Sequence, residues 1–274
     1  MTTDRTKSAD REKAAMRAMT EWVAPIEPAM LARTVIISPH FDDAVLSCGR
    51  LLAAVAPATV VTVTGGDRRD GYDEVTWWDG LGGFQPGDDV VAARRAEDVA
   101  ALGVLGCTST YLDFTDHQYD LPHPGAERPS LDEVAAAIEA KLDELAPTAV
   151  FVPIGLANPD HVMTGDACLQ LVQRHLEAGD ARWSWFAYAE AGYSHIPGLV
   201  VHRTARAMRA GVWPTPAPLP IDGHLDEKIA ALQCYVTQIG PLTHDWALDP
   251  QRSPAVPESY WRLEAAPTGW AMTP

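Results

Sequence analysis

Two short segments of the sequence concentrate side chains that can bind a metal ion or transfer protons. The first, residues 39–43, reads PHFDD and places one histidine and two aspartates within four residues. The second, residues 158–161, reads NPDH. Imidazole nitrogens and carboxylate oxygens are ligands of catalytic zinc, and a further carboxylate can act as a general base in hydrolysis. If the two segments meet in the fold, they predict a hydrolytic metal site.

Each segment directly follows an apolar run that is typical of a buried strand. Residues 34–38 (TVIIS) precede the first segment, and residues 149–154 (AVFVPI) precede the second. Similar runs predict further strands at 59–64, 110–114 and 183–190. Apolar positions at helical spacing predict helices at 45–55, 90–105, 130–145 and 160–176, the third of which opens with a capping-box pattern.

This alternation of strands and helices predicts an α/β fold, with a Rossmann-like, mostly parallel sheet and helices on both faces. We expect the strand order 3-2-1-4-5, in which the two polar segments meet where such sheets bind ligands. We expect one domain over residues 1–274, with a core at about 34–195 and an irregular C-terminal extension at about 196–274. The proline-rich residues 213–220 (WPTPAPLP) should form an extended connection within that extension.

On this layout two histidines and one aspartate converge, a common ligand set for catalytic zinc with an open position for water. The second aspartate, Asp42, then remains as a base. A structural interpretation competes, because Asp42 and Asp43 can cap one helix and Asp160 can cap another. Either segment alone fits both interpretations, but their occurrence after the first and fourth strands favours a metal site.

At these segments the sequence resembles the GlcNAc-phosphatidylinositol de-N-acetylase family, also called PIG-L or LmbE-like proteins. The family signatures PHPDDE and HPDH correspond here to PHFDDA at residues 39–44 and NPDH at residues 158–161. Weaker similarities follow in family order over about residues 34–262. They are Arg94-x-x-Glu97, Leu105-Gly106, Leu112-Asp113-Phe114-x-Asp116, Lys228-x-x-Ala231, Tyr235 and Gln238.

The resemblance implies a Rossmann-like, zinc-dependent hydrolase that removes an N-acetyl group from an N-acetylglucosaminyl compound. The substrate would be an amino-sugar small molecule or natural product. Carried over by position, Zn²⁺ is held by His40, Asp43 and His161, and Asp42 is the general base.

Two positions depart from the family pattern. Ala44 replaces a glutamate, and Asn158 replaces a histidine that in the family assists at the tetrahedral intermediate. Asn158 stays a catalytic candidate because an amide N–H can donate to an oxyanion, although it cannot deliver a proton. Arg68 in a long loop, Asp116 in a weak motif and Tyr193 after the fifth strand are the expected substrate contacts.

Composition limits the partners. The formal net charge of −16 argues against nucleic acid and anionic membrane, both of which attract basic surfaces. A small-molecule substrate is the expected partner, and a homo-oligomer stays open. A charged N-terminus, no long apolar run and four scattered cysteines without a CxxC pair predict a cytoplasmic protein.

Two alternative functions stay open. One is an amidase that acts on a thiol conjugate or on a non-sugar N-acyl amide. The other is a non-catalytic binding protein on the same fold, which the departures at Ala44 and Asn158 would favour. Because the three inferred ligands and Asp42 are all present, the sequence favours the enzyme.

Overall fold

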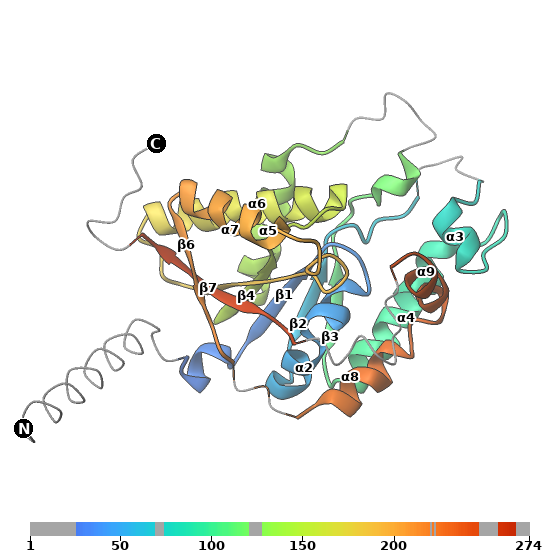
Figure 1. The fold of residues 1–274 in the computed structure, drawn as a ribbon, viewed down its shortest axis with the longest axis horizontal. Coiled ribbons are helices and arrows are strands. Elements are labelled where there is room, and N and C mark those ends of the chain that lie inside the picture. Colours follow the sequence, from blue (N-terminus) through green and yellow to red (C-terminus); the bar gives the residue numbers. More distant parts are fainter. Residues whose placement is uncertain are drawn as a thin grey trace, which may run out of the picture.

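The computed structural model describes residues 26–68, 74–120, 128–219, 221, 223–246 and 257–266 (Figure 1). A seven-stranded sheet in the order β3-β2-β1-β4-β5-β7-β6 forms its centre. Strands β3 to β5 in this order run parallel, and β7 is antiparallel to both of its neighbours. The predicted α/β fold and the order 3-2-1-4-5 are confirmed. The strands are β1 (Thr34–Ser38), β2 (Thr59–Thr62), β3 (Thr108–Tyr111), β4 (Ala149–Pro153), β5 (Ser184–Tyr188), β6 (Val212–Pro216) and β7 (Tyr260–Ala265).

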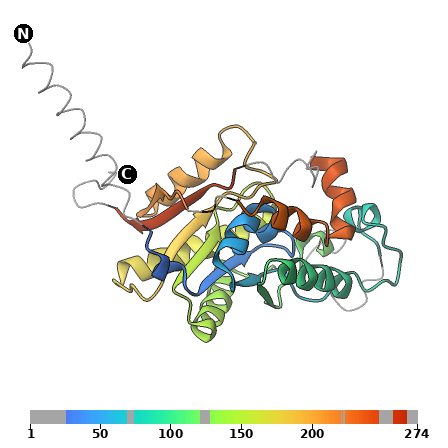
Figure 2. The same cartoon turned by 90° about the horizontal axis from the view of Figure 1, so that it is seen from below.

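Helices cover both faces of the sheet (Figures 1 and 2). Both faces of the sheet are apolar, because successive side chains of a strand point to opposite faces. In β1, Ile36 belongs to the core beneath one helical layer, and Val35 and Ile37 belong to the core beneath the other. The first layer holds α2 (Asp43–Val55), α4 (Val90–Val104) and α8 (Leu225–Leu232). The second holds α5 (Leu131–Leu145), α6 (Pro159–Glu177) and α7 (Leu199–Arg209). The helices α3 (Trp77–Leu81) and α9 (Val236–Trp246) lie together at one end, and the short 3₁₀ turns are η1 (Pro28–Leu31) and η2 (His117–Tyr119).

Most predicted elements are confirmed, including the capping box that opens α5 at Ser130. The third strand is an exception, because it begins at Thr108 and ends at Tyr111 rather than spanning 110–114. Strand β3 is an edge strand that pairs only with β2, and its last paired residue faces Thr62, where β2 ends. The apolar residues that suggested a longer strand lie beyond that pairing.

The prediction that residues 213–220 form only a connection was wrong. Strand β6 (Val212–Pro216) occupies the start of this segment and pairs with β7. Proline is tolerated in an edge strand, where alternate backbone N–H groups have no neighbour to bond. Pro214 and Pro216 fit here because β6 has one neighbouring strand only. Of the tryptophans near the C-terminus, Trp261 lies within β7, and Trp270 lies outside the described residues.

Helix α2, which begins in the first polar segment, is interrupted at Cys48 (φ −134°, ψ 18°). The Glu258 carboxylate accepts hydrogen bonds from the backbone amides of Arg50 (2.9 Å) and Leu51 (3.2 Å), just after the break. Lys228 Nζ lies 2.7 Å from Glu258 Oε1, and both side chains are at most 2% exposed. A buried ion pair from the C-terminal part of the chain therefore caps the second half of α2.

We expect Glu258→Gln to lower the free energy of unfolding by about 3–5 kcal/mol, because the Lys228 ammonium then stays buried without a counter-charge. The double variant Glu258→Gln/Lys228→Met should recover much of this loss, since it removes the unpaired charge as well. Urea denaturation of the wild type, both single variants and the double variant measures the coupling. Equal midpoints for the wild type and Glu258→Gln would contradict this account.

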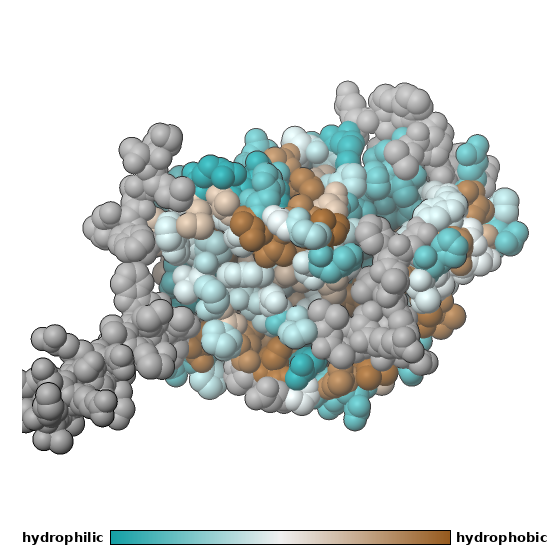
Figure 3. All heavy atoms as spheres, in the orientation of Figure 1, coloured by the Kyte–Doolittle hydropathy of each residue, from teal (hydrophilic) through white to brown (hydrophobic). Residues whose placement is uncertain are grey.

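The surface carries no single dominant apolar face in the view of Figure 3, where small hydrophobic patches lie between hydrophilic side chains. Trp77, at the start of α3, is 62% exposed. Within the described ranges, no helix is long and apolar enough to cross a membrane.

Candidate active site

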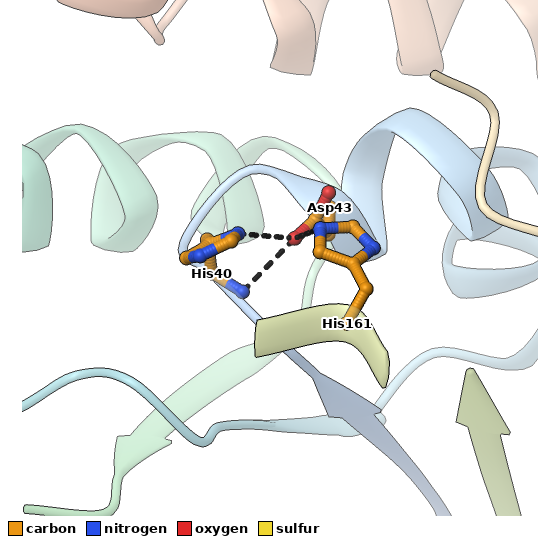
Figure 4. Close-up of side chains that lie close together, drawn as sticks. All are labelled: His40, Asp43 and His161. Atoms are coloured by element: carbon orange, nitrogen blue, oxygen red, sulfur yellow. Dashed lines mark hydrogen bonds and ion pairs between the residues drawn. The ribbon is translucent and has the colours of Figure 1, made fainter. Parts of the chain in front are cut away.

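The two polar segments meet at the carboxyl ends of the neighbouring strands β1 and β4. His40 comes from the loop after β1, Asp43 is the first residue of α2, and His161 comes from the first turn of α6 (Figure 4). Asp43 Oδ2 lies 3.0 Å from His40 Nδ1 and 3.0 Å from His161 Nε2. One atom from each of the three residues lies within 4.8 Å of the others, close enough to share one ion.

Helix capping does not account for Asp42. This residue stands at the N-cap position of α2, yet its side chain makes no capping hydrogen bond. Ser38 serves the helix end instead, because its Oγ accepts from the Ala44 amide (3.0 Å) while it donates to the His40 carbonyl (2.6 Å). The carboxylate of Asp42 is thereby left to face the cavity.

A buried carboxylate faces the second ring nitrogen of each histidine. His40 Nε2 lies 3.2 Å from Asp160 Oδ2, and His161 Nδ1 lies 3.4 Å from Glu190 Oε1. Glu190 is fixed in turn by the backbone amides of residues 155 and 156, at 2.9 and 2.7 Å. Carboxylates in this position orient the imidazole ligands of metal sites. The sequence suggested only a capping role for Asp160, and for Glu190 only a place in a wall of the substrate site.

The cluster is electrostatically suited to a cation. Burial alone would lower the pKa of His161, but Asp43 and Glu190 outweigh it and raise the pKa to about 9. Burial also opposes the charge of His40, yet nearby carboxylates, Asp116 foremost, raise its pKa well above the ordinary value. Burial would raise the pKa of Asp43, but contacts with both histidines hold it below the ordinary range. Two imidazole nitrogens and one carboxylate oxygen fit zinc.

Asp42 has a different environment from its neighbour. Its side chain is 8% exposed, and burial followed by the negative charge of Asp43 raises its pKa to about 6. A carboxylate whose pKa approaches neutrality is a stronger base than an ordinary aspartate and still ionises at pH 7. The two consecutive aspartates are therefore distinguished by their surroundings.

A cavity of about 240 Å³ opens over this cluster. Its floor is formed by His40, Asp42, Asp43 and His161. Its apolar wall is formed by side chains of α2, α3, α4 and α9: Leu46, Trp77, Trp78, Val91 and Leu242. The volume is below the range of about 300–1,000 Å³ typical of drug-sized ligands, so it suits one sugar ring better than an extended molecule.

Of the predicted substrate contacts, Asp116 and Tyr193 line the cavity, and Arg68 is not among its lining residues. The Arg68 guanidinium donates to the Asp88 carbonyl and lies over the Tyr119 ring, 5.9 Å from its centroid. The arginine that does line the cavity is Arg94, which the sequence singled out only as part of a weak motif.

Arg94 belongs to a buried group that holds α3 against α4. Its Nη2 donates to Asp79 Oδ1 over 2.7 Å, and Tyr119 donates to the other oxygen of Asp79 over 3.2 Å. Gln238 of α9 accepts from Trp78 Nε1 over 2.9 Å. Residues of the weak motifs therefore support the apolar wall, a role that spacing alone does not reveal.

Asn158 both caps α6 and lines the cavity. Its Oδ1 accepts from the Asp160 amide over 2.8 Å, which leaves the side-chain N–H₂ as the donor toward the Tyr193 hydroxyl. Tyr193 packs edge-on against His161 with ring centroids 5.0 Å apart. Burial raises the pKa of Tyr193, so its hydroxyl keeps its proton. Two hydrogen-bond donors thus stand beside the three clustered residues.

Residues 35–172 match the family model described as PIG-L: GlcNAc-PI de-N-acetylase. This range includes both polar loops and half of the chain. The chain belongs to the PIG-L family. The predicted family and, at family level, the predicted N-deacetylase class are confirmed.

Several proteins that are similar to this chain in sequence or structure are named as deacetylases. The chain is 27% identical to 2'-N-acetylparomamine deacetylase of Streptomyces fradiae over 220 residues, which cover 75% of this chain and 73% of that protein. It also resembles the solved structures of A40926 pseudoaglycone deacetylase (26% identity, TM-score 0.63) and of the zinc-inhibited form of teicoplanin deacetylase (25% identity, TM-score 0.64). Each structural match covers 86% of this chain and 99% of the other.

Proposed function

We propose that this PIG-L protein is a zinc-dependent N-deacetylase that acts on an N-acetylated amino sugar, free or attached to a natural product. The convergence of His40, Asp43 and His161 beneath a cavity that Asp42 also lines carries this proposal. These three side chains would hold the ion with the number of protein ligands that is usual for catalytic zinc. The likeness to an enzyme named for 2'-N-acetylparomamine supports an amino-sugar substrate.

The chemistry follows from the positions of the side chains. His40, Asp43 and His161 would hold a zinc ion that, when bound, would lower the pKa of water and polarise an amide carbonyl. Asp42 accepts the proton of the attacking water and returns it to the leaving amine. Asn158 and Tyr193 donate hydrogen bonds to the oxygen on which negative charge develops. We assign both proton transfers to Asp42, since the amide of Asn158 cannot deliver a proton and the raised pKa of Tyr193 makes its hydroxyl a poor acid.

The cavity also indicates how the substrate is oriented. An acetyl group that is to be hydrolysed must approach His40, Asp43 and His161, and the polar groups of the ring would then meet other lining residues such as Asp116 and Arg94. Trp77 lines the cavity and is 62% exposed, so we infer that whatever the ring is attached to leaves the cavity beside this side chain. Arg68 would contact only a substrate that reaches beyond the cavity.

Acetate release from methyl N-acetylglucosaminide by zinc-loaded protein tests the function. We expect about one zinc ion per chain and turnover that a chelator abolishes and zinc restores. Binding of the glycoside without acetate release would favour a non-catalytic binding protein. Release of acyl groups only from non-sugar amides would retain the hydrolase and overturn the amino-sugar assignment.

The two roles of Asn158 can be separated by substitution. Asn158→Ala should lower turnover by about 10²–10³, the usual loss for one oxyanion donor, and should cost about 1 kcal/mol of stability through the lost cap. Asn158→Ser should restore stability, because serine caps a helix as well as asparagine, but not turnover, because its hydroxyl is too short to take the place of the amide. Steady-state kinetics and thermal denaturation of both variants provide the comparison. Full activity in Asn158→Ala would move the oxyanion donor to Tyr193 alone.

A further inference from the structure

A carboxyl group that the proposed chemistry does not use lies fully buried in α4. Asp98 has 0% exposure, and none of the described cations forms an ion pair with it. Its two oxygens meet two tyrosine hydroxyls: Oδ1 lies 2.9 Å from the Tyr235 hydroxyl, and Oδ2 lies 3.1 Å from the Tyr111 hydroxyl. An ionised carboxylate in this position would be buried without a counter-charge, which is costly.

Both tyrosines also contact Phe41. The Tyr235 hydroxyl lies 3.0 Å from the Phe41 carbonyl oxygen, and the Tyr111 ring packs edge-on against the Phe41 ring with centroids 5.5 Å apart. Phe41 stands between His40, a proposed metal ligand, and Asp42, the proposed base. The contacts of Asp98 therefore end on the peptide that joins these two residues.

The number of available protons favours the neutral form of Asp98 over the ionised form. The Tyr235 hydroxyl has one proton but faces two acceptors, the Phe41 carbonyl and Asp98. If Asp98 is ionised, the carboxylate competes for that proton and the carbonyl loses its donor. If Asp98 is neutral, it donates to Tyr235, Tyr235 donates to Phe41, and Tyr111 donates to the remaining Asp98 oxygen. Ser109, 2.8 Å from the Tyr111 hydroxyl, can complete the chain as a donor.

We propose that Asp98 is a positioning residue that works as a neutral carboxylic acid, directing the Tyr235 hydroxyl to the Phe41 carbonyl and so fixing the loop that carries His40 and Asp42. Burial raises the pKa of Asp98 to about 7 against the opposing effect of the two tyrosines, and the charge of Asp42 acts in the same direction as burial. Within the described residues, Asp98 is therefore hydrogen-bonded to two hydroxyls, and the charge that acts on it is that of another acid.

Kinetics of four variants test the positioning role, and this part rests on the proposed deacetylase function. Asp98→Asn keeps a donor for Tyr235 and an acceptor for Tyr111, so kcat for acetate release should stay within about threefold of the wild type. Asp98→Ala and Tyr235→Phe should each lower kcat by about tenfold or more, with KM within about twofold, because the reacting groups are misplaced while binding persists.

Tyr188→Phe is the matched control. The Tyr188 hydroxyl is also buried and donates to a backbone carbonyl, that of Ile37 at 2.8 Å, but this carbonyl belongs to strand β1 and not to the loop. We expect it to lower the melting temperature as much as Tyr235→Phe does and to leave kcat unchanged. Equal losses of kcat in the two variants would show a general effect of lost stability and overturn the proposal. Asp98→Asn as impaired as Asp98→Ala would overturn it too.

The protonation state has a readout that does not depend on activity. At pH 6 an ordinary aspartate, with a pKa of about 3.9, is ionised. The infrared spectrum of the wild type minus that of Asp98→Asn should then show the carbonyl stretch of a protonated carboxyl group. A carboxylate band in its place would overturn the proposal even in an active enzyme. If the wild type deacetylates nothing, the proposed function fails, and the spectrum still decides the state of Asp98.

Discussion

Asp42→Asn is expected to retain the metal and to lose turnover by about two to four orders of magnitude, the contribution of a general base. Asparagine has the same shape as aspartate but cannot accept a proton from water. The substitution should leave the fold intact, because Asp42 makes no capping hydrogen bond and Ser38 satisfies the helix end. Steady-state kcat, measured together with the metal content by elemental analysis, checks both halves of the prediction.

The neighbouring aspartate supplies the control. Asp43→Ala should lose the metal along with turnover, because Asp43 Oδ2 is the atom that both histidines approach to 3.0 Å. The wild-type kcat/KM should also fall as the pH drops through the pKa of Asp42, which lies at or below about 6 when a cation is nearby. That acidic limb should be absent from the residual activity of Asp42→Asn. If both variants kept metal and full activity, the two roles would be wrongly assigned.

The convergence of the two loops could be predicted from the sequence because the expected strand order, 3-2-1-4-5, makes β1 and β4 neighbours. Strands that alternate with helices must cross over in one hand, and the carboxyl ends of parallel strands share one edge. The three clustered residues then follow from the ends of those strands. This reasoning uses only the order of elements, which apolar periodicity reveals well.

The supporting residues could not be found in this way. Asp160 and Glu190 face the outer nitrogens of His40 and His161, and such a contact depends on the exact approach of α6 to the loop after β5. Arg94 reaches the cavity because its partner Asp79 draws α3 against α4. Arrangements of this kind are set by tertiary packing and leave no periodic trace in the sequence.

The C-terminal part of the chain shows the same limit. Strand β6 contains two prolines, a composition that argues against a strand unless the strand lies at an edge. Whether a strand lies at the edge depends on the order of all strands in the sheet, and this order is known only from the complete structure. The burial of Lys228 against Glu258 likewise joins a residue of α8 to one in the segment before β7.

His161→Ala is expected to strip the metal and abolish turnover. The His161 ring is 1% exposed and lies between Asp43 Oδ2 at 3.0 Å and Glu190 Oε1 at 3.4 Å. Because the ring is buried, no side chain from the surface can take its place as a ligand. Zinc at about 1,000 times its dissociation constant should stabilise the wild type by about 4 kcal/mol, because it binds only the folded state. The variant should show no zinc-dependent rise in melting temperature.

A second buried histidine makes the comparison specific. His175 is 4% exposed and also lies between two carboxylates, with its nitrogens 3.0 Å from Glu139 and 3.2 Å from Asp180, but it is remote from the cavity lining. His175→Ala should lose stability and keep both stoichiometric zinc and the zinc-dependent rise in melting temperature. If His161→Ala instead retained zinc and turnover, the ion would be held elsewhere. Within the described residues the other group able to hold one is His40, Asp116 and Asp160, so that Asp116→Asn would then become the variant that loses the metal.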